Sequence, residues 1–257
     1  MITGASSGLG KALAIQCASM GMHIILIALP GSSTASLARN IALQYGVSVQ
    51  VFEFDLTDSQ ALHSHLEHIT RHYNVNFLVN NAGMGGTSHL VDSTVENIDR
   101  IIQLNVRSTA MVTRLMIPYL LKNERSYIMN ISSMAAFTPI AYKTVYPATK
   151  AFISSFSLGL KEEFAGTGLS VSVVYPGPMM TNSQTSRRII GQGFKGKMGL
   201  LTATAIAKLA VHKTLAGQPA IIPGWMNRVN HLLMSLLPVE WKSRIVSREV
   251  KKEIQYA

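Results

Sequence analysis

Short, β-branched apolar stretches alternate with longer amphipathic stretches along most of the chain. The short stretches are almost continuously apolar, which is typical of strands buried on both faces of a parallel sheet. They cover residues 23–29, 47–54, 76–81, 126–132, 169–176 and 219–224. Helix-like runs lie between them, at residues 10–20, 34–45, 59–73, 95–121, 145–165 and 202–216. This alternation predicts an α/β fold in which helices cover both faces of one sheet.

The predicted architecture is a Rossmann-like, doubly wound parallel sheet with three layers, forming a single domain over residues 1–257. No linker, low-complexity tract or internal repeat divides the chain. A chain of 257 residues can form one domain when the fold is α/β. Only Met1 and Ile2 precede the first glycine-rich motif, so the first strand is either very short or clipped at its start. We expect no signal peptide before it.

The composition narrows the class of protein. The chain is 47% hydrophobic with a mean hydropathy of +0.23, which argues against disorder. No apolar run reaches the roughly 18 residues that a membrane-spanning helix needs. The single cysteine, Cys17, excludes an internal disulfide and fits a cytoplasmic protein. Because Cys17 lies in an apolar helical run, we expect it to be buried.

The charge is strongly positive, at +10 with a pI of about 9.8. Such a charge suggests nucleic-acid binding, but no basic stripe with interleaved aromatic residues appears, so we expect none. Basic residues gather late in the chain, in the stretches 187–197 and 242–252. A solvated surface is the plain interpretation of these stretches. Attraction of an anionic substrate or lipid surface is the alternative.

The motif TGASSGLG at residues 3–10 follows the first strand and opens a helix. Its glycines, Gly4, Gly8 and Gly10, would let the backbone approach a pyrophosphate closely, and the helix N-terminus would supply free N–H groups. A simple turn is the alternative for a glycine-rich segment taken alone. The position at the first strand–helix junction favours the phosphate-binding interpretation.

Polar residues mark the ends of later strands. Asp55 follows the strand at 47–54 and could accept a hydrogen bond from an exocyclic amine such as that of adenine; a turn aspartate is the alternative. The NNAG turn at residues 80–83 would leave space at the carboxyl edge of the sheet, where ligands of open α/β sheets bind. Asn105 lies inside a helical run, where asparagine is unfavourable, so we expect a local kink or a water site there.

Tyr146 and Lys150 are four residues apart and therefore share one face of the predicted helix at 145–165. Ser133 ends the strand at 126–132 and could donate to a carbonyl oxygen. A free tyrosine has a pKa near 10, and a neighbouring ammonium group would favour the phenolate. This arrangement predicts a tyrosine that acts as an acid or base. Pro147 fits only if the helix begins near Tyr146.

Six features occur in a characteristic order: TGASSGLG, NNAG, Asn105, Ser133, YPATK at 146–150 and YPGPMMT at 175–181. Together they resemble the short-chain dehydrogenase/reductase family over residues 3 to about 181. A weaker similarity runs through residues 201–227 and resembles the reductases that act on ketones, steroids and long-chain 3-oxoacyl thioesters.

The resemblance implies an NAD(P)(H)-dependent oxidoreductase that transfers a hydride between nicotinamide and a carbonyl or alcohol substrate. The expected reaction is the reduction of an apolar ketone or 3-oxoacyl compound. Tyr146 would exchange the proton, Ser133 would hold the substrate oxygen, Lys150 would bind the nicotinamide ribose, and Asn105 would anchor a water. The implied cofactor-binding residues are Gly4, Ser6, Ser7, Gly8, Leu9, Gly10, Asp55, Leu56, Asn81, Ala82, Gly83, Tyr146, Lys150, Pro176, Gly177 and Thr181. No metal is implied, and a homodimer or homotetramer is expected.

The choice between NAD and NADP depends on the end of the second strand, where a carboxylate would bind the ribose diol of NAD and an arginine the extra phosphate of NADP. Ala28 and Leu29 stand there, so neither signal is present. The apparent absence of a carboxylate favours NADP(H), with NAD as the alternative. Candidate donors to the phosphate are Ser32, Ser33, Thr34 and Arg39. A pocket that binds neither cofactor well would make the chain a catalytically weak or silent binding or regulatory protein.

Two later segments are expected to shape the substrate side. Residues 182–200 would cover the substrate, with Met179 and Met180 as an adaptable wall or simply as core packing. Residues 225–257 would form a C-terminal helical extension. Its apolar positions are Trp225, Met226, Val229, Leu232, Leu233, Leu236 and Leu237. Their helical spacing favours core packing or a dimer contact, and peripheral membrane contact is the alternative.

Four histidines crowd the helical run at 59–73, namely His63, His65, His68 and His72. His68 and His72 share a face, but no carboxylate completes a metal-binding pattern. We therefore expect surface residues.

Overall fold

The computed structural model describes residues 1–179 and 199–255. Within these residues, a seven-stranded sheet has the order β3-β2-β1-β4-β5-β6-β7, and every neighbouring pair of strands is parallel. The strands are β1 (Ile2–Thr3), β2 (Ile24–Ala28), β3 (Val49–Glu53), β4 (Phe77–Asn80), β5 (Ser126–Ile131), β6 (Leu169–Val174) and β7 (Ala220–Ile221). The predicted parallel sheet is confirmed.

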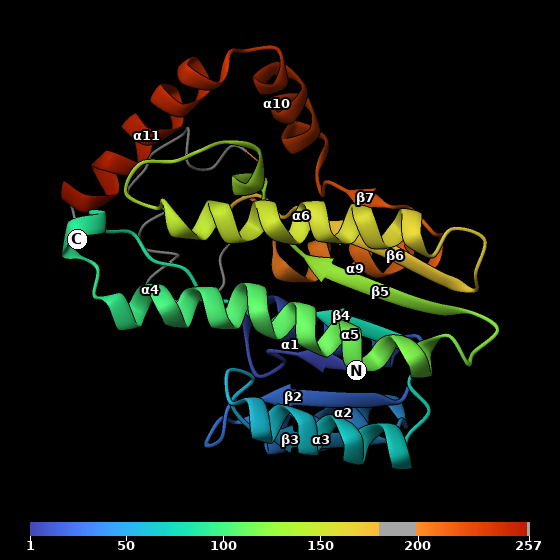
Figure 1. The fold of residues 1–257 in the computed structure, drawn as a ribbon. Helices are drawn as coiled ribbons and strands as arrows, with labels where there is room; N and C mark the ends of the chain where they lie inside the picture. Colours follow the sequence, from blue (N-terminus) through green and yellow to red (C-terminus); the bar gives the residue numbers. More distant parts are fainter. Residues whose placement is uncertain (180–198, 256–257) are drawn as a thin grey trace.

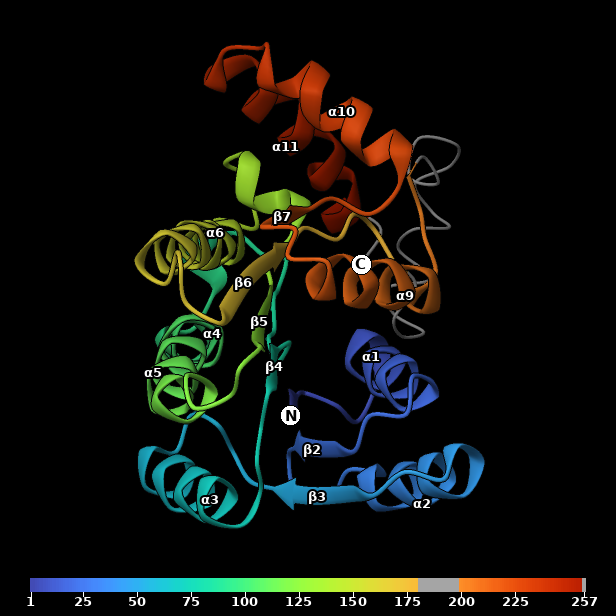
Figure 2. The same cartoon turned by 90° about the vertical axis from the view of Figure 1, so that its right-hand side faces the viewer.

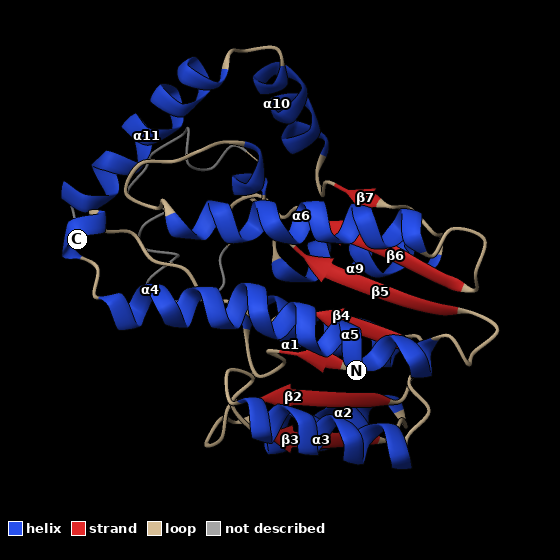
Figure 3. Cartoon of the chain, viewed as in Figure 1, coloured by secondary structure: helices blue, strands red, loops and turns tan. Residues whose placement is uncertain are grey.

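Helices alternate with these strands along the chain (Figure 3). They are α1 (Gly8–Ser19), α2 (Thr34–Tyr45), α3 (Ser59–His72), α4 (Val95–Ile102), α5 (Ser108–Leu120), α6 (Val145–Glu163), α9 (Ala203–Leu215), α10 (Trp225–Ser235) and α11 (Val239–Gln255). Short helical turns lie at η1 (Leu90–Asp92), η2 (Gln103–Arg107) and η3 (Met134–Phe137).

Helices cover both faces of the sheet, as Figure 2 shows. On one face, α1, α2 and α9 bury residues such as Leu13 and Ile206 against Leu26 and Val79 of the sheet. On the other face, α3, α5 and α6 bury residues such as Leu66 and Met116 against the sheet. Alternate apolar residues of each strand therefore face one core or the other, which is why the strand sequences are nearly continuous apolar runs. Cys17 is buried in the first core, as predicted.

The strand order reverses direction between β1 and β4, which are adjacent although β2 and β3 separate them in sequence. Ile2 of the short strand β1 pairs with Leu26 on one side and with Val79 on the other. Ligands of open α/β sheets bind beyond the carboxyl ends of the strands at such a reversal. The glycine-rich turn follows β1, and the NNAG turn follows β4 (Figure 1).

The long helical run expected at 95–121 is divided into α4 and α5 by the π-helical turn η2, which contains Asn105. The kink predicted from this asparagine is therefore present as a local π-helical turn. Pro147 lies in the first turn of α6, which begins at Val145, so its missing N–H costs no helical hydrogen bond.

The C-terminal helices α10 and α11 extend beyond the sheet and form an arch at one end of the molecule (Figure 1). On α11, Val239, Trp241 and Ile245 are exposed. Most of the predicted apolar positions at α10 are exposed too: Trp225, Val229, Leu232, Leu233 and Leu236. The expectation that this stripe packs into the core of the same chain is therefore wrong for these side chains. Among the described helices, none is long and apolar enough to span a membrane.

Candidate active site

The glycine-rich turn between β1 and α1 is as closely packed as its sequence suggests. Gly4 has φ +62° and Gly8 has φ +53°, a region that glycine enters without strain. A Cβ at Gly4 would lie 2.8 Å from the Cα of Ala82, and one at Gly10 would lie 2.1 Å from the carbonyl oxygen of Gly4. Any side chain at Gly4 or Gly10 would thus push the turn, α1 and the NNAG segment apart.

The NNAG turn is tied to the glycine-rich turn by its second asparagine. The Asn81 side chain donates to the carbonyl oxygens of Thr3 and Gly4 at 3.0 and 3.1 Å. The Thr3 hydroxyl accepts from the backbone N–H groups of Asn81 and Ala82, both at 3.0 Å. The predicted cofactor residues of these two turns are therefore brought together across the β1–β4 reversal.

The N-terminus of α1 faces this region without an acidic neighbour in its first turn. Ser7 is the N-cap, and its side chain makes no capping hydrogen bond. The first N–H groups of a helix have no partner within the helix, and the helix dipole favours an anion there. The narrow glycine turn and this helix end together fit the pyrophosphate of a dinucleotide.

Asn105 is completely buried beside the NNAG turn. Its side-chain oxygen accepts from the Met84 N–H at 2.9 Å, and its amide donates to the Met84 carbonyl at 2.8 Å and to the Thr149 hydroxyl at 3.0 Å. Asn105 therefore fixes the segment after β4 against α6, the helix that carries Tyr146 and Lys150.

Lys150 is buried, with its ammonium group beneath the exposed Gly83. The Nζ donates to the carbonyl oxygen of Ile131 at 2.9 Å, and a Cβ at Gly83 would lie 3.4 Å from it. Burial lowers the pKa of Lys150 from 10.5 to about 8. A buried ammonium group costs free energy unless it is well paired, so this lysine sits in an unfavourable position unless a ligand adds further acceptors.

Tyr146 lies one turn before Lys150, in the first turn of α6. The Lys150 Nζ is 5.8 Å from the centre of the Tyr146 ring. Burial raises the pKa of Tyr146, and a side-chain hydrogen bond with Ser133 opposes that rise. The Ser133 hydroxyl also accepts from the N–H of Ala135 at 3.1 Å. Asn105, Ser133, Tyr146 and Lys150 are thus brought together at the carboxyl edge of β4 and β5.

The sequence-based expectation that Lys150 acidifies Tyr146 does not hold in the protein alone. Desolvation dominates both residues: it raises the pKa of the phenol and lowers that of the ammonium group. The neutral phenol is therefore the favoured state, which suits a proton donor.

The other predicted cofactor residues surround the same edge of the sheet. Ser6 is half-buried and Ser7 is exposed in the glycine-rich turn. The side chains of Leu9 and Leu56 lie in the core, so only their backbone could face a cofactor. Asp55 accepts from the Thr57 N–H at 2.9 Å and from its hydroxyl at 2.8 Å, which is the turn geometry kept as the alternative.

The loop after β6 carries the last predicted cofactor residues. The Pro176 carbonyl accepts from the N–H of Met134, beside Ser133, at 3.0 Å. A Cβ at Gly177 would lie 2.7 Å from the side chain of Asn227 on α10. Met179 packs against the core, whereas Thr181, Met180 and residues 182–198 of the expected substrate-covering segment lie outside the described residues.

Several residues near the site escaped the sequence analysis. Gly85 touches the Tyr146 ring, since a Cβ there would lie 2.8 Å from Cδ2 of that ring. Tyr142 has φ +67°, an uncommon conformation for a bulky residue, and its carbonyl accepts from the Ser88 N–H at 2.8 Å. Glu53, at the end of β3, directs its carboxylate to the loop after β2. Only Glu53 could have been found from sequence, by aligning the ends of parallel strands.

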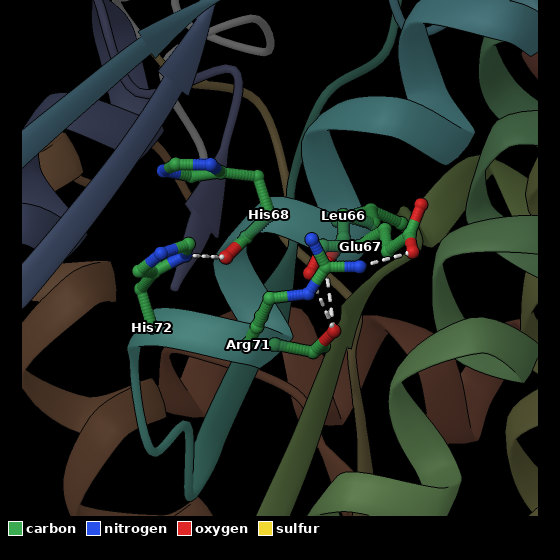
Figure 4. A network of polar contacts seen from close by, with 6 residues as sticks. Leu66, Glu67, His68, Arg71 and His72 are labelled. Carbon is green, nitrogen blue, oxygen red and sulfur yellow. Dashed lines mark hydrogen bonds and ion pairs between the residues drawn. The ribbon is translucent and has the colours of Figure 1, made fainter.

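The four histidines lie on α3, away from this site. His68 and His72 are exposed with their rings stacked 4.2 Å apart, next to the ion pair between Arg71 and Glu67 (Figure 4). His65 is instead half-buried and stacks on Phe54 at 4.4 Å, so the surface expectation fails for this one residue. Among the described residues, no group of histidine, cysteine and carboxylate side chains is arranged to hold a metal ion.

A cavity of about 320 Å³ lies at the opposite edge of the sheet, near the amino ends of β2 and β4. Its walls include Ile24, Ile25, Phe77 and Tyr73. β1 pairs only with the later residues of β2 and β4, so it does not lie between their amino ends, which pair with β3 and β5 alone. Because none of the predicted catalytic residues lines this cavity, we do not connect it with the chemistry.

Comparisons with known proteins agree with this geometry. The family described as short chain dehydrogenase matches residues 1–189. The chain therefore belongs to the short-chain dehydrogenase family and is an oxidoreductase of the group that acts on alcohol and carbonyl groups.

Two relatives illustrate the similarity. An uncharacterized oxidoreductase of Staphylococcus epidermidis is 34% identical over 182 residues, which cover 70% of this chain and 77% of the relative. A very-long-chain 3-oxoacyl-CoA reductase of Anas platyrhynchos is 33% identical over 180 residues, covering 68% of this chain and 58% of that protein.

Solved structures confirm the Rossmann-like fold. A 7beta-hydroxysteroid dehydrogenase has a TM-score of 0.87 at 23% identity, covering 95% of both chains. A short-chain dehydrogenase of Sphingobium yanoikuyae in complex with NADPH has a TM-score of 0.77 at 27% identity, covering 92% of this chain and 95% of that one. A member of the family from Burkholderia phymatum in complex with NAD has a TM-score of 0.80 at 22% identity, covering 91% of this chain and 92% of that one.

Proposed function

We propose that this protein reduces an apolar ketone or 3-oxoacyl compound to the alcohol, and catalyses the reverse oxidation, with a nicotinamide cofactor. The observation that carries the proposal is the convergence of Ser133, Tyr146 and the buried Lys150 beside the glycine-rich and NNAG turns. The substrate class rests on the relatives, one of which bears the name of a 3-oxoacyl-CoA reductase. When bound, the cofactor supplies or accepts the hydride.

The residues of the chain handle the proton and the substrate oxygen. In reduction, the Tyr146 O–H donates its proton to the carbonyl oxygen, while Ser133 donates a hydrogen bond to the same oxygen. The oxygen thereby becomes a hydroxyl, and Tyr146 is left as a phenolate. Lys150 is placed to stabilise that phenolate and to donate to the cofactor ribose. The raised pKa of Tyr146 in the protein alone keeps its proton available at neutral pH.

Asn105 contributes by holding neighbouring residues of the site in position. Its three hydrogen bonds hold Met84 and Thr149 in place, next to Gly83 and Gly85, which contact Lys150 and Tyr146. We propose that the π-helical turn at Asn105 also anchors a water that returns protons to the site.

The experiment that tests this proposal has two stages. The purified protein is titrated with NADH and with NADPH while nicotinamide fluorescence is followed, and it is then screened against ketones of increasing apolar size with cofactor oxidation as the readout. Binding followed by turnover supports the proposal. Binding of neither cofactor, or binding without any turnover, contradicts the proposal and favours the alternative of a catalytically silent binding or regulatory protein.

We also propose that the protein is cytoplasmic, forms a homodimer or homotetramer, and makes peripheral contact with anionic membranes through α10 and α11. The exposed apolar stripe of these helices, including Trp225 and Trp241, lies beside the exposed basic residues Arg228, Arg244 and Arg248. Apolar and basic residues on one surface suit an anionic lipid headgroup region. The membrane contact is supported if the unmodified protein co-sediments with phosphatidylserine vesicles and the double variant Trp225→Ser/Leu232→Ser does not. If light scattering shows that this double variant is monomeric, the stripe belongs to a subunit interface instead.

A further inference from the structure

The last residue of β3, Glu53, places a carboxylate at the end of β2. In the parallel pairing of these strands, Glu53 lies directly opposite Ala28, the final residue of β2. Its Oε1 accepts a hydrogen bond from the Ser32 hydroxyl at 3.2 Å, and the Gly31 N–H points at its Oε2 at 3.4 Å. The carboxylate therefore belongs spatially to the loop between β2 and α2, although the sequence of that loop contains no acidic residue.

In a doubly wound fold, this loop lies where the protein contacts the adenosine ribose of the cofactor. The reading residue normally follows β2, where a carboxylate accepts from the ribose hydroxyls of NAD, and a positive group binds the 2′-phosphate of NADP. Here the exposed Leu29 follows Ala28, so neither residue supplies a polar group. Glu53 is half-buried, and in the described part of the chain no ion pair with lysine or arginine neutralises it. A negative charge therefore remains at this position.

Two of the three hydroxyl groups expected to receive a phosphate, those of Ser32 and Thr34, are already engaged. Ser32 donates its only hydroxyl hydrogen to Glu53, so the hydrogen bond between Ser32 and Thr34 must be donated by Thr34. Both hydroxyl hydrogens point along a chain that ends on the carboxylate. Neither is free to donate to a 2′-phosphate unless this chain is broken.

We infer that Glu53 makes the cofactor site select NAD(H) over NADP(H), an inference that rests on the proposed nicotinamide-dependent function. The carboxylate can accept from the ribose diol of NAD, and it repels the phosphate of NADP. The sequence-based preference for NADP(H) assumed that no carboxylate lies near this loop. The parallel register of β2 and β3 removes that assumption, because it brings in an acidic residue from the neighbouring strand.

The test measures the dissociation constants of NADH and NADPH by nicotinamide fluorescence, in the unmodified protein and in Glu53→Gln. The unmodified protein should bind NADH more tightly than NADPH. Glu53→Gln, which keeps the size of the side chain, should shift the ratio of the two constants towards NADPH by on the order of tenfold. Glu162→Gln, the same change at an exposed residue of α6, serves as the matched control and should leave the ratio unchanged.

A second variant separates the charge from the shape of the loop. Ser32→Ala removes the donor that holds the carboxylate but keeps its charge, so the preference for NADH should persist. In contrast, a Ser32→Ala variant that shifts the ratio as much as Glu53→Gln does would assign the effect to loop structure and overturn the inference. Raising the salt concentration should narrow the difference between Glu53→Gln and the unmodified protein, because added ions screen a partly exposed charge.

Failure of the inference and failure of the proposed function look different. Binding of NADH with an unchanged ratio in Glu53→Gln, or tighter binding of NADPH by the unmodified protein, overturns the inference alone. No binding of either cofactor by any variant overturns the proposed function, and the inference with it.

Discussion

Two polar clusters each include residues of α6, and they differ in how completely their hydrogen bonds are satisfied. The first, here called the ladder, joins Thr113, Asn80, Asn130 and Ser157. Asn80 donates to Thr113 and to Asn130, both at 2.8 Å, Asn130 donates to Ser157 at 2.9 Å, and Ser157 donates to the Ile153 carbonyl at 2.6 Å. All four residues are buried, and the ladder needs no ligand.

The second cluster comprises Asn105, Ser133, Tyr146 and Lys150. Only Asn105 is saturated by the chain itself. Lys150 has three hydrogens to donate and makes one hydrogen bond within residues 1–179 and 199–255, to Ile131. Burial destabilises the charged forms of both Lys150 and Tyr146. Helix α6 therefore contributes to one cluster that stabilises the fold and to another that, on this account, ligands complete.

Among the variants that test this contrast, Tyr146→Phe should have the largest effect on turnover. The change removes the proton donor and leaves the ring against Gly85, so turnover should fall by about 10³-fold or more. The affinity for the cofactor should change little, because no phosphate-binding element is altered. Steady-state kinetics with fluorescence titration measure both quantities, and a turnover close to that of the unmodified protein would exclude Tyr146 as the proton donor.

Asn130→Ala should lower the stability of the protein and leave turnover almost unchanged, the reverse of Tyr146→Phe. It removes one of the two acceptors of the Asn80 amide and the donor to Ser157 inside the core, so the free energy of unfolding should fall by about 3 kcal/mol. Turnover per folded molecule should stay within about threefold, because the ladder touches none of the reacting groups. Urea unfolding and active-site titration test this prediction. A large loss of turnover in well-folded protein would mean that the two clusters are coupled.

The neighbouring serines after β5 offer a sharper comparison. Ser133→Ala should lower turnover about 30-fold, since its hydroxyl faces Tyr146. Loss of the hydrogen bond from the Ala135 N–H should cost about 1 kcal/mol of stability. Ser132 donates instead to the Lys150 carbonyl at 2.7 Å, so Ser132→Ala should cost about 1 kcal/mol of stability. Its turnover should stay within about threefold. Equal kinetic losses in the two variants would contradict the assignment of Ser133 to the substrate oxygen.

The fold was predictable from sequence because it depends on the apolar pattern that two cores impose on the strands. The positions of Gly4, Gly10 and Pro147 were also predictable, since close packing or a helix start restricts the residue type. The contact of Glu53 with Ser32 was missed because it depends on how the ends of β2 and β3 align, and the apolar pattern was used only to locate the strands. The predicted effect of the site on Tyr146 also had the wrong sign, because desolvation depends on burial in three dimensions.

The C-terminal helices illustrate a different limit. The helical spacing of Trp225, Val229 and Leu232 correctly predicted one apolar face. It could not tell whether that face meets the core of the same chain, and the structure leaves it exposed. A periodic pattern fixes which residues share a face, whereas the partner of that face depends on where the helix leaves the sheet.

A smaller effect concerns the pH dependence of stability. Burial lowers the pKa of Lys150 to about 8, so between pH 8 and 10.5 the unfolded chain binds a proton that the folded protein does not. Stability should therefore rise with pH in this range, by about 2 kcal/mol between pH 7 and 9.5. Lys150→Met should lack this contribution, so the rise should be about 2 kcal/mol smaller than in the unmodified protein. The buried Met1 ammonium group and Cys17 thiol also have shifted pKa values in this range, but they are common to both proteins. The comparison stops at pH 9.5, below the usual tyrosine pKa, because above it the raised pKa of Tyr146 would lower stability as the pH rises. The measurement is the urea midpoint of the unmodified protein and of Lys150→Met at pH 7 and 9.5.

The central claim is that a nicotinamide cofactor completes the unsatisfied cluster around Lys150 and leaves the ladder untouched. The most direct measurement is the rise in melting temperature on adding saturating NADH or NADPH, whichever binds more tightly, to the unmodified protein, Asn130→Ala and Lys150→Met. Ligand binding to the folded state should raise the melting temperature of the first two proteins by the same several degrees. The rise should be less than half as large in Lys150→Met. An equal rise in all three proteins, or none in any of them, would contradict the account.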